Sequence, residues 1–242
     1  MPAAAQPLRR DADHCGGRVH TQGMSTYLFL FIIPMAAGFA AQAWVRRAVA
    51  RAQERPAQMT GAEAAHAILA RHGHLDVRVE GSPGGPLSDH YDPTAGVVRL
   101  SDAIANRRSA AAVAIAAHEC GHVLQHRTAH AMFRLRSTLA PAAGFASRMW
   151  VLPLMLGLVA GYVGLIWVAI ALFSAVLLFH LVTLPVEIDA SRRALRLIRE
   201  HGLLPEADVP SARGVLVAAA STYLVAALTS IAMLVYMLGA RR

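Results

Sequence analysis

The sequence predicts a mainly α-helical, integral membrane protein with about four spans and a small α+β domain outside them. The first observation behind this prediction is composition, because 55% of the 242 residues are hydrophobic and only 16% are charged. That is too apolar for one soluble domain of this length. The second observation is three long stretches without Asp, Glu, Lys or Arg, and the third is the segment "HECGH" between the first two.

The N-terminal region precedes the first apolar stretch. Residues 1–23 carry proline, glycine and scattered charges without periodicity, and Met24 stands directly before the apolar run. They predict either a disordered extension or a chain that truly starts at Met24. The run that follows predicts a transmembrane helix over 24–45. Its span length and the lack of a convincing cleavage site argue against a cleaved signal peptide.

The segment 46–148 is expected to hold the domain outside the membrane. Thr60 and Glu63 have the spacing of a capping box, which predicts a helix that starts there and ends at Gly73. Alternation over "DVRVEG" predicts a strand, and Val97–Leu100 is predicted as an edge strand. An extended peptide could pair with such an edge, although a purely structural hairpin would give the same pattern.

The second charge-free stretch, residues 149–186, is too long for one span. A straight helix of that length would measure about 57 Å, about twice the thickness of the hydrocarbon core. The stretch therefore predicts a transmembrane hairpin, with Gly157 and Gly161 where the chain packs closely or turns. The alternative is a hairpin buried in a soluble protein. Residues 187–213 then predict a helix outside the bilayer, and 214–240 the fourth transmembrane helix.

The charges indicate topology and not a nucleic-acid partner. All 23 basic residues are arginines and the net charge is +8, but no RNP-like, zinc-finger or helix-turn-helix pattern accompanies them. Of these arginines, 18 fall in 46–148 and 187–213, which four spans would place on one side, and 5 fall on the other side. The positive-inside rule predicts that the arginine-rich side is cytoplasmic. Cys15 and Cys120 make no disulfide framework, and Cys120 is expected to be a small core residue.

The segment "HECGH" lies in an alanine-rich run, Ser109–His126, that predicts a largely buried helix. On a helix, His118 and His122 lie on one face about 5–6 Å apart, so both can bind one zinc ion. Glu119 lies beside them and can take a proton from water activated by the metal. The pattern predicts a zincin-like catalytic domain, and the alternative is a pair of histidines with only a structural role.

The third ligand must come from elsewhere in the chain. A metzincin would carry Gly and His where Gln125 and Thr128 stand, so that class is excluded. A gluzincin takes a glutamate from a later helix. Glu187 is the predicted ligand, because it follows Pro185 at the expected first turn of the helix where the hairpin re-emerges. Asp189 is rotated about 200° from it and is kept as the reserve ligand. The acidic residues after His122 are Glu187, Asp189, Glu200, Glu206 and Asp208.

Other polar residues near the motif receive weaker assignments. His126 and His130 continue the i, i+4 series, but each step is about 6 Å along the axis, so they are expected to be solvated or to contact the ligands from outside. His90 and Tyr91 are candidate substrate or oxyanion contacts, with ordinary loop residues as the alternative. Arg192 is a second candidate for holding the oxyanion.

Five segments of the chain resemble, in order, those of the YugP-type membrane zinc metallopeptidases of bacteria. The resemblance runs from about Met24 to the C-terminus. It implies a zinc-dependent peptidase in the bacterial inner membrane, with His118 and His122 as ligands, Glu119 as base, and polypeptides, membrane proteins among them, as substrates. The segments are "YDPTAGVVRLS", "SAAAVAIAAHECGHVLQHR", "FRLRSTLAP", "TLPVEIDASRRAL" and "AAASTYLVAALTS".

More distantly, the chain is similar to HtpX-type membrane proteases, in which a hydrophobic hairpin separates HExxH from a helix with E-x-x-x-D. Glu187 fits the glutamate of that pattern, but Ser191 stands where the aspartate is expected. A serine accepts a hydrogen bond from a histidine less strongly than a carboxylate does, so this departure concerns the groups that orient the ligands.

The sequence therefore predicts a membrane-bound zinc endopeptidase facing the cytoplasm, with two alternatives. One is an intramembrane site-2-type protease, against which stand Arg107 and Arg108 close before His118 and the lack of an "LDG" or "NPDG" segment. The other is a non-catalytic zinc-binding scaffold or regulator, which has no need for the base Glu119.

Overall fold

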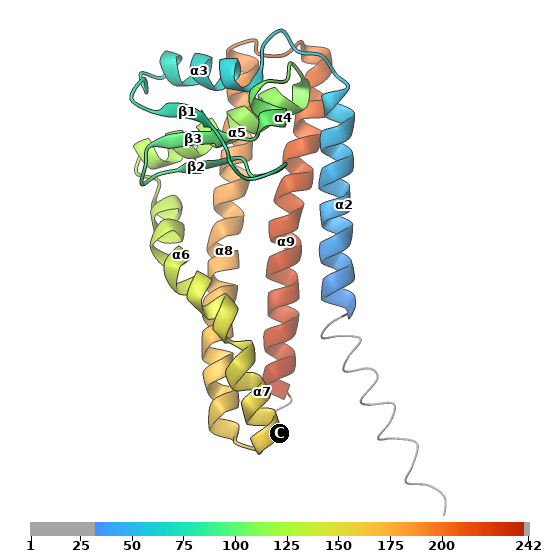
Figure 1. Ribbon diagram of the computed structural model, residues 1–242, viewed down its shortest axis with the longest axis vertical. Helices are drawn as coiled ribbons and strands as arrows, with labels where there is room; N and C mark the ends of the chain where they lie inside the picture. Colours follow the sequence, from blue (N-terminus) through green and yellow to red (C-terminus); the bar gives the residue numbers. More distant parts are fainter. Residues whose placement is uncertain (1–31, 240–242) are drawn as a thin grey trace, which may run out of the picture. The chain divides into compact units, whose positions relative to one another are not determined.

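The computed structural model describes residues 32–239, and most of them are helical (Figure 1). The predicted extension 1–23 and residues 24–31 of the predicted first span lie outside the described residues. The chain divides into two compact units, 1–36 and 37–242, and the second contains the sheet, the "HECGH" segment and the apolar hairpin. The elements are α2 (Ile33–Gln53), α3 (Gly61–Arg71), β1 (Arg78–Gly81), β2 (His90–Asp92), β3 (Val97–Leu100), α4 (Asp102–Ala105), α5 (Ala110–Arg127), α6 (Ala131–Met149), α7 (Val151–Ala160), α8 (Val163–Glu200), η2 (Glu206–Asp208) and α9 (Val209–Gly239).

The small sheet has the strand order β1-β3-β2, in which β3 is parallel to β1 and antiparallel to β2. The prediction of a strand at Val97–Leu100 is confirmed, but its place at the sheet edge is wrong. Both sides of β3 are hydrogen-bonded to neighbours, so no peptide can pair with it. A local pattern of alternation cannot reveal this, because it reports which residues are buried and not which strand lies beside which. The edges of the sheet are β1 and β2.

Helix α5 carries the "HECGH" segment and is the most deeply buried helix of the domain. It begins after Ser109, whose side chain accepts a hydrogen bond from the backbone N–H of Ala112, as a helix cap does. Its alanines are fully buried, and their small side chains let α3 and α8 pack closely against it. Helix α3 begins with the predicted capping box of Thr60 and Glu63, and Gly73 follows it with φ 72°.

The apolar hairpin extends further than residues 149–186. Its first arm starts with α6 at Ala131 and continues through α7, the chain turns at Gly161 with φ 64°, and α8 forms the whole return arm. The expectation that Glu187 lies in the first turn of a new helix is wrong, because Pro185 lies inside α8. Proline removes one backbone hydrogen bond, but packing of α8 against α5, α6 and α9 keeps the helix continuous through it.

Three helical segments of the described residues are long and apolar enough to cross a membrane: Ala131–Ala160, Val163–Glu200 and Glu206–Gly239. Their most apolar windows are only 17%, 28% and 28% buried, so most of their surface is available to lipid. The predicted first span, 24–45, is described only in part, where α2 begins. Within the apolar halves of α8 and α9, a hydrogen bond of 2.8 Å joins His180 to Ser230, a contact that helps hold membrane helices together.

Candidate metal centre

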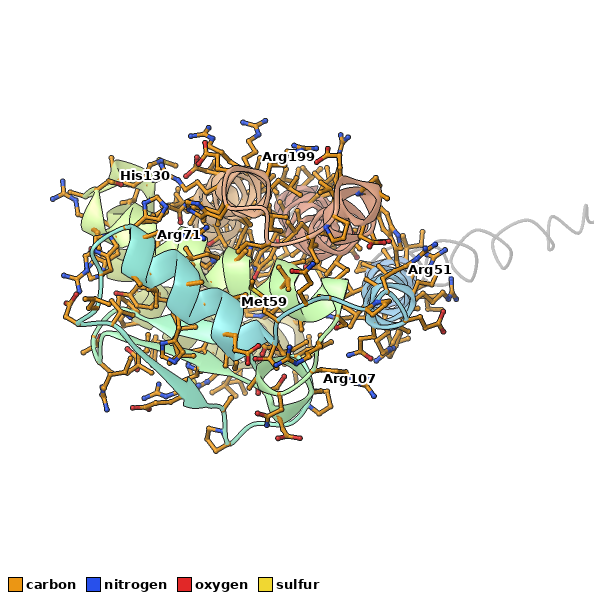
Figure 2. All side chains as sticks on the ribbon, turned by 90° about the horizontal axis from the view of Figure 1, so that it is seen from above. Arg51, Met59, Arg71, Arg107, His130 and Arg199 are labelled. Atoms are coloured by element: carbon orange, nitrogen blue, oxygen red, sulfur yellow. The ribbon has the colours of Figure 1, made fainter. Side chains whose placement is uncertain are left out.

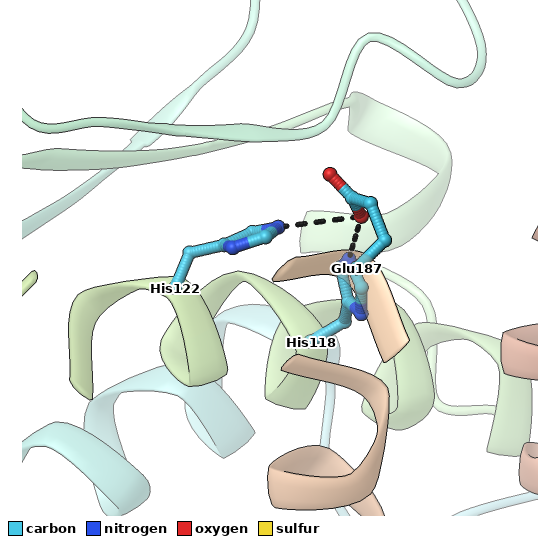
Figure 3. A group of neighbouring side chains, drawn as sticks. All are labelled: His118, His122 and Glu187. Atoms are coloured by element: carbon cyan, nitrogen blue, oxygen red, sulfur yellow. Dashed lines mark hydrogen bonds and ion pairs between the residues drawn. The ribbon is translucent and has the colours of Figure 1, made fainter. Parts of the chain in front are cut away.

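Two histidines of α5 and one glutamate of α8 converge, although Glu187 lies 65 positions after His122 in the sequence (Figure 3). The Nε2 atoms of His118 and His122 lie 3.1 and 3.6 Å from one carboxylate oxygen of Glu187. Ligands bound to tetrahedral zinc at 2.0–2.1 Å are about 3.3 Å apart. The donor set and its spacing therefore fit a zinc ion with three protein ligands and one open position.

The glycine of "HECGH" explains how α8 comes close enough to supply Glu187. A Cβ atom on Gly121 would lie 2.8 Å from the backbone oxygen of Ala190, closer than a side chain tolerates. The two helices thus touch backbone to backbone one turn from Glu187. This contact fixes the distance between the helix that carries the histidines and the helix that carries the glutamate.

Gln125 holds His122 and was not identified from the sequence as part of the site. Its side-chain nitrogen donates to the carbonyl of Val186 at 2.9 Å and to Asp189 at 2.8 Å, and its oxygen lies 2.9 Å from Nδ1 of His122. Because the amide nitrogen faces two acceptors, the oxygen must face His122, and Nδ1 must carry the proton. Nε2 of His122 then carries no proton, and its lone pair is free to bind a metal ion.

Ser191 makes the corresponding contact with the other histidine. Its hydroxyl lies 3.3 Å from Nδ1 of His118. The serine that departs from the E-x-x-x-D pattern therefore still contacts the ligand, at a distance and with a group that make a weaker bond than a carboxylate would.

Glu187 has a further partner, Arg136 of α6, whose Nη2 lies 3.3 Å from its other carboxylate oxygen. Arg136 belongs to the segment "FRLRSTLAP", but no role was predicted for it. The sequence feature that could have pointed to Arg136 is a charged residue in a helix that leads into an apolar span.

Asp189, the reserve ligand, lies outside the metal group and accepts hydrogen bonds from Gln125 and from Arg193 at 2.7 Å.

Tyr91, His126 and His130 make contacts outside the metal group. The Tyr91 hydroxyl is hydrogen-bonded to Nδ1 of His126 at 2.9 Å, and His130 caps α6 by accepting from the backbone N–H of Phe133. Neither histidine belongs to the metal group. Cys120 is fully buried and its sulfur faces the carbonyl of Ala65 on α3, away from the ligands.

Glu119 is a buried carboxyl beside the metal group. Burial raises the pKa of Glu119 to about 7, although the charge of His118 and a hydrogen bond from the backbone of Tyr91 act in the opposite direction. A pKa near neutrality suits a group that takes up and returns a proton during a reaction. Glu119, His118 and Glu187 all line one cavity of about 220 Å³.

Tyr223 of α9 lines the same cavity, and its side chain interacts with that of Glu187. The three residues predicted as substrate or oxyanion contacts, His90, Tyr91 and Arg192, are not among those that line it. Tyr223 lies in the segment "AAASTYLVAALTS", but an apolar helix gives no sign of which residue faces a site on another element.

Replacing Gln125 by leucine is expected to weaken zinc binding about 10- to 100-fold, because His122 loses the group that fixes its ring and proton. Chelator competition on the purified protein measures the change. Thr128→Val, at the exposed end of the same helix, is the matched control and should bind zinc normally. Unaltered zinc affinity in the leucine variant would rule out this role for Gln125.

Comparison with known proteins gives two matches. The family model described as "Putative neutral zinc metallopeptidase" matches residues 27–242. The chain is also 41% identical over 207 residues to "Putative membrane protease YugP" of Bacillus subtilis (strain 168), an alignment that covers 85% of this chain and 92% of that protein. No solved structure gives a significant match.

Proposed function

The chain belongs to the neutral zinc metallopeptidase family whose model matches it, and we propose that it is a membrane-bound zinc endopeptidase of the gluzincin type. The observation that carries this proposal is the convergence of His118, His122 and Glu187 next to the buried base Glu119, on the wall of one cavity. A site that only stores or senses zinc has no need of an unligated carboxyl at that position.

In the proposed mechanism, His118, His122 and Glu187 hold the zinc ion. Zinc, when bound, supplies a Lewis acid that polarises the scissile carbonyl and makes water easier to deprotonate. Glu119 takes the proton from the attacking water and returns it to the leaving amine. Gln125 and Ser191 keep the two imidazoles oriented throughout, because their contacts are to the ring nitrogens that face away from the metal group.

Tyr223 is the proposed donor to the negative charge that develops on the carbonyl oxygen. Its position on the cavity wall beside the ligands supports this role. A neutral phenol can also donate a hydrogen bond without bringing a charge into an apolar wall.

Tyr223→Phe is expected to lower kcat about 10²- to 10³-fold and to leave KM and zinc content nearly unchanged. Tyr236→Phe, further along α9, is the matched control. A variant that instead loses zinc would make Tyr223 a support for Glu187.

The arrangement of arginines supports a cytoplasmic placement of the site. Viewed from the end of the molecule that carries α3, the side chains of Arg51, Arg107 and Arg199 lie around its periphery (Figure 2). We place this end on the cytoplasmic side of a bacterial inner membrane, following the positive-inside rule. The substrates are polypeptides.

Removal and return of zinc test the proposed function directly. Purified protein in detergent should hydrolyse an unfolded protein substrate, lose that activity when a chelator removes the metal, and recover it with about one equivalent of zinc, the stoichiometry of a three-ligand catalytic site. Metal analysis accompanies each step. Hydrolysis that persists in metal-free protein, or its absence in fully loaded protein, would reject the proposal.

A further inference from the structure

The catalytic cavity lies where several helices change from charged to apolar sequence. Along α8, residues 163–186 carry no charge and Glu187 is the first acidic residue after them. Along α9, the charge-free stretch starts at residue 214, just before the first residue of that helix that lines the cavity. Along α2, the charges begin at Arg46, between lining residues Val45 and Val49. The metal group is therefore level with the boundary at which a bilayer would begin.

From this level the cavity extends along the apolar part of α9. Its last lining residue, Tyr223, is roughly 14 Å along the helix axis from the start of the charge-free stretch. Val45 and Val49 of α2 and Val215 and Ala219 of α9 form an apolar part of the cavity wall. Much of the apolar wall thus comes from α2 and from α9, and α9 is one of the helices that could cross a membrane. Leu87 and Asp89 of the loop before β2 also line the cavity, but no residue of the three strands does.

The charges on the cavity wall exclude some substrate residues. The carboxyl groups of Asp89, Glu119 and Glu187 line the cavity, and no arginine is among the lining residues in the described part of the chain. An acidic side chain would meet these groups without a cation to pair with. The volume of about 220 Å³ is below the roughly 300–1,000 Å³ of sites for drug-sized ligands, so it suits a single side chain.

We propose that this cavity binds an apolar side chain next to the scissile bond of a membrane-anchored polypeptide, and that the bond cut lies at the surface of the bilayer, within a few residues of the substrate's own transmembrane segment. This inference rests on the proposed peptidase function and names its substrate class. A bond held at the level of Glu187 places the adjoining substrate residues beside α2 and α9, where an apolar wall stabilises them by burial. Anchoring in the same membrane also raises the effective concentration of the substrate.

The test uses the zinc-loaded full chain in proteoliposomes and three substrates with one cleavable sequence. In the first, a leucine-containing site directly follows a transmembrane segment. In the second, a Gly/Ser linker of about 20 residues separates them, which as a flexible coil holds the site well away from the surface. The third is the untethered peptide. We expect the first substrate to be cut at least tenfold faster than the other two, and at least tenfold faster than its Leu→Asp form.

Two variants locate the pocket. Ala219→Trp fills the cavity and should slow cleavage of the first substrate at least tenfold while zinc content stays unchanged. Val217→Trp, on the exposed side of α9 and outside the cavity lining, should cut as the unaltered chain does. A benzophenone amino acid in place of the substrate leucine, used with the inactive Glu119→Gln protein, should crosslink to α2 or α9 even if Ala219→Trp does not fold.

The outcomes separate the two proposals. Equal zinc-dependent rates for the three substrates, or crosslinks only to the sheet or to α3, would overturn the inference and leave the peptidase function standing. If the loaded protein cuts none of the three substrates, nor the unfolded protein, the peptidase function itself is rejected, and the substrate class with it.

Discussion

Glu119→Gln is expected to abolish measurable hydrolysis, with kcat lowered at least about 10²- to 10⁴-fold, and to leave zinc bound. Glutamine has the shape of glutamate and can still accept hydrogen bonds from the residues around it, but it cannot take up the proton of the attacking water. The zinc ligands are unaffected, because Glu119 is not one of the three converging groups. Zinc content from metal analysis and the rate on an unfolded protein substrate are measured on the same preparation.

The control for this variant is Glu54→Gln, an exposed carboxyl directly after α2 and outside the cavity lining. It should keep both zinc and activity. Full activity of the Glu119 variant would reject Glu119 as the base. Loss of zinc together with activity would show that Glu119 supports the metal group instead of acting on water.

The parts of the site that the sequence predicted depend on local geometry. Helical spacing of i and i+4 was enough to bring His118 and His122 together on α5, and the Ser109 cap fixed the start of that helix. Glu187 could be selected because few acids follow the motif and one of them lies where an apolar hairpin returns. The prediction of its place in a new helix was nevertheless wrong, since α8 continues through Pro185.

The parts that the sequence did not reveal depend on which elements pack together. Gln125, Arg136 and Tyr223 lie on three different helices, and none carries a signature that indicates contact with the metal group. The position of β3 at the centre of the sheet has the same cause, because alternation predicts a strand but not its neighbours. That the small domain is zincin-like stays a prediction.

Replacing Glu187 by alanine is expected to remove zinc almost completely at zinc concentrations that saturate the unaltered protein. Loss of a contact outside the ligand set weakens zinc binding about 10- to 100-fold, and loss of one of three ligands should exceed that. The change also leaves Arg136 without its carboxylate partner and His118 without the group 3.1 Å away. The first effect weakens the contact between α8 and α6 and the second the contact between α8 and α5, so the thermal stability of the metal-free protein should fall as well.

Asp189→Asn tests whether Glu187 or Asp189 is the third zinc ligand. Asp189 lies two residues from Glu187 but bonds to Gln125 and Arg193, so its replacement should change zinc affinity by no more than the loss of Gln125 does. Retention of zinc by Glu187→Ala together with its loss in Asp189→Asn would reverse the assignment of the third ligand. If the alanine variant is too unstable to purify, Glu187→Gln keeps the shape of the side chain and should still lose zinc, because a neutral amide binds zinc far more weakly than a carboxylate does.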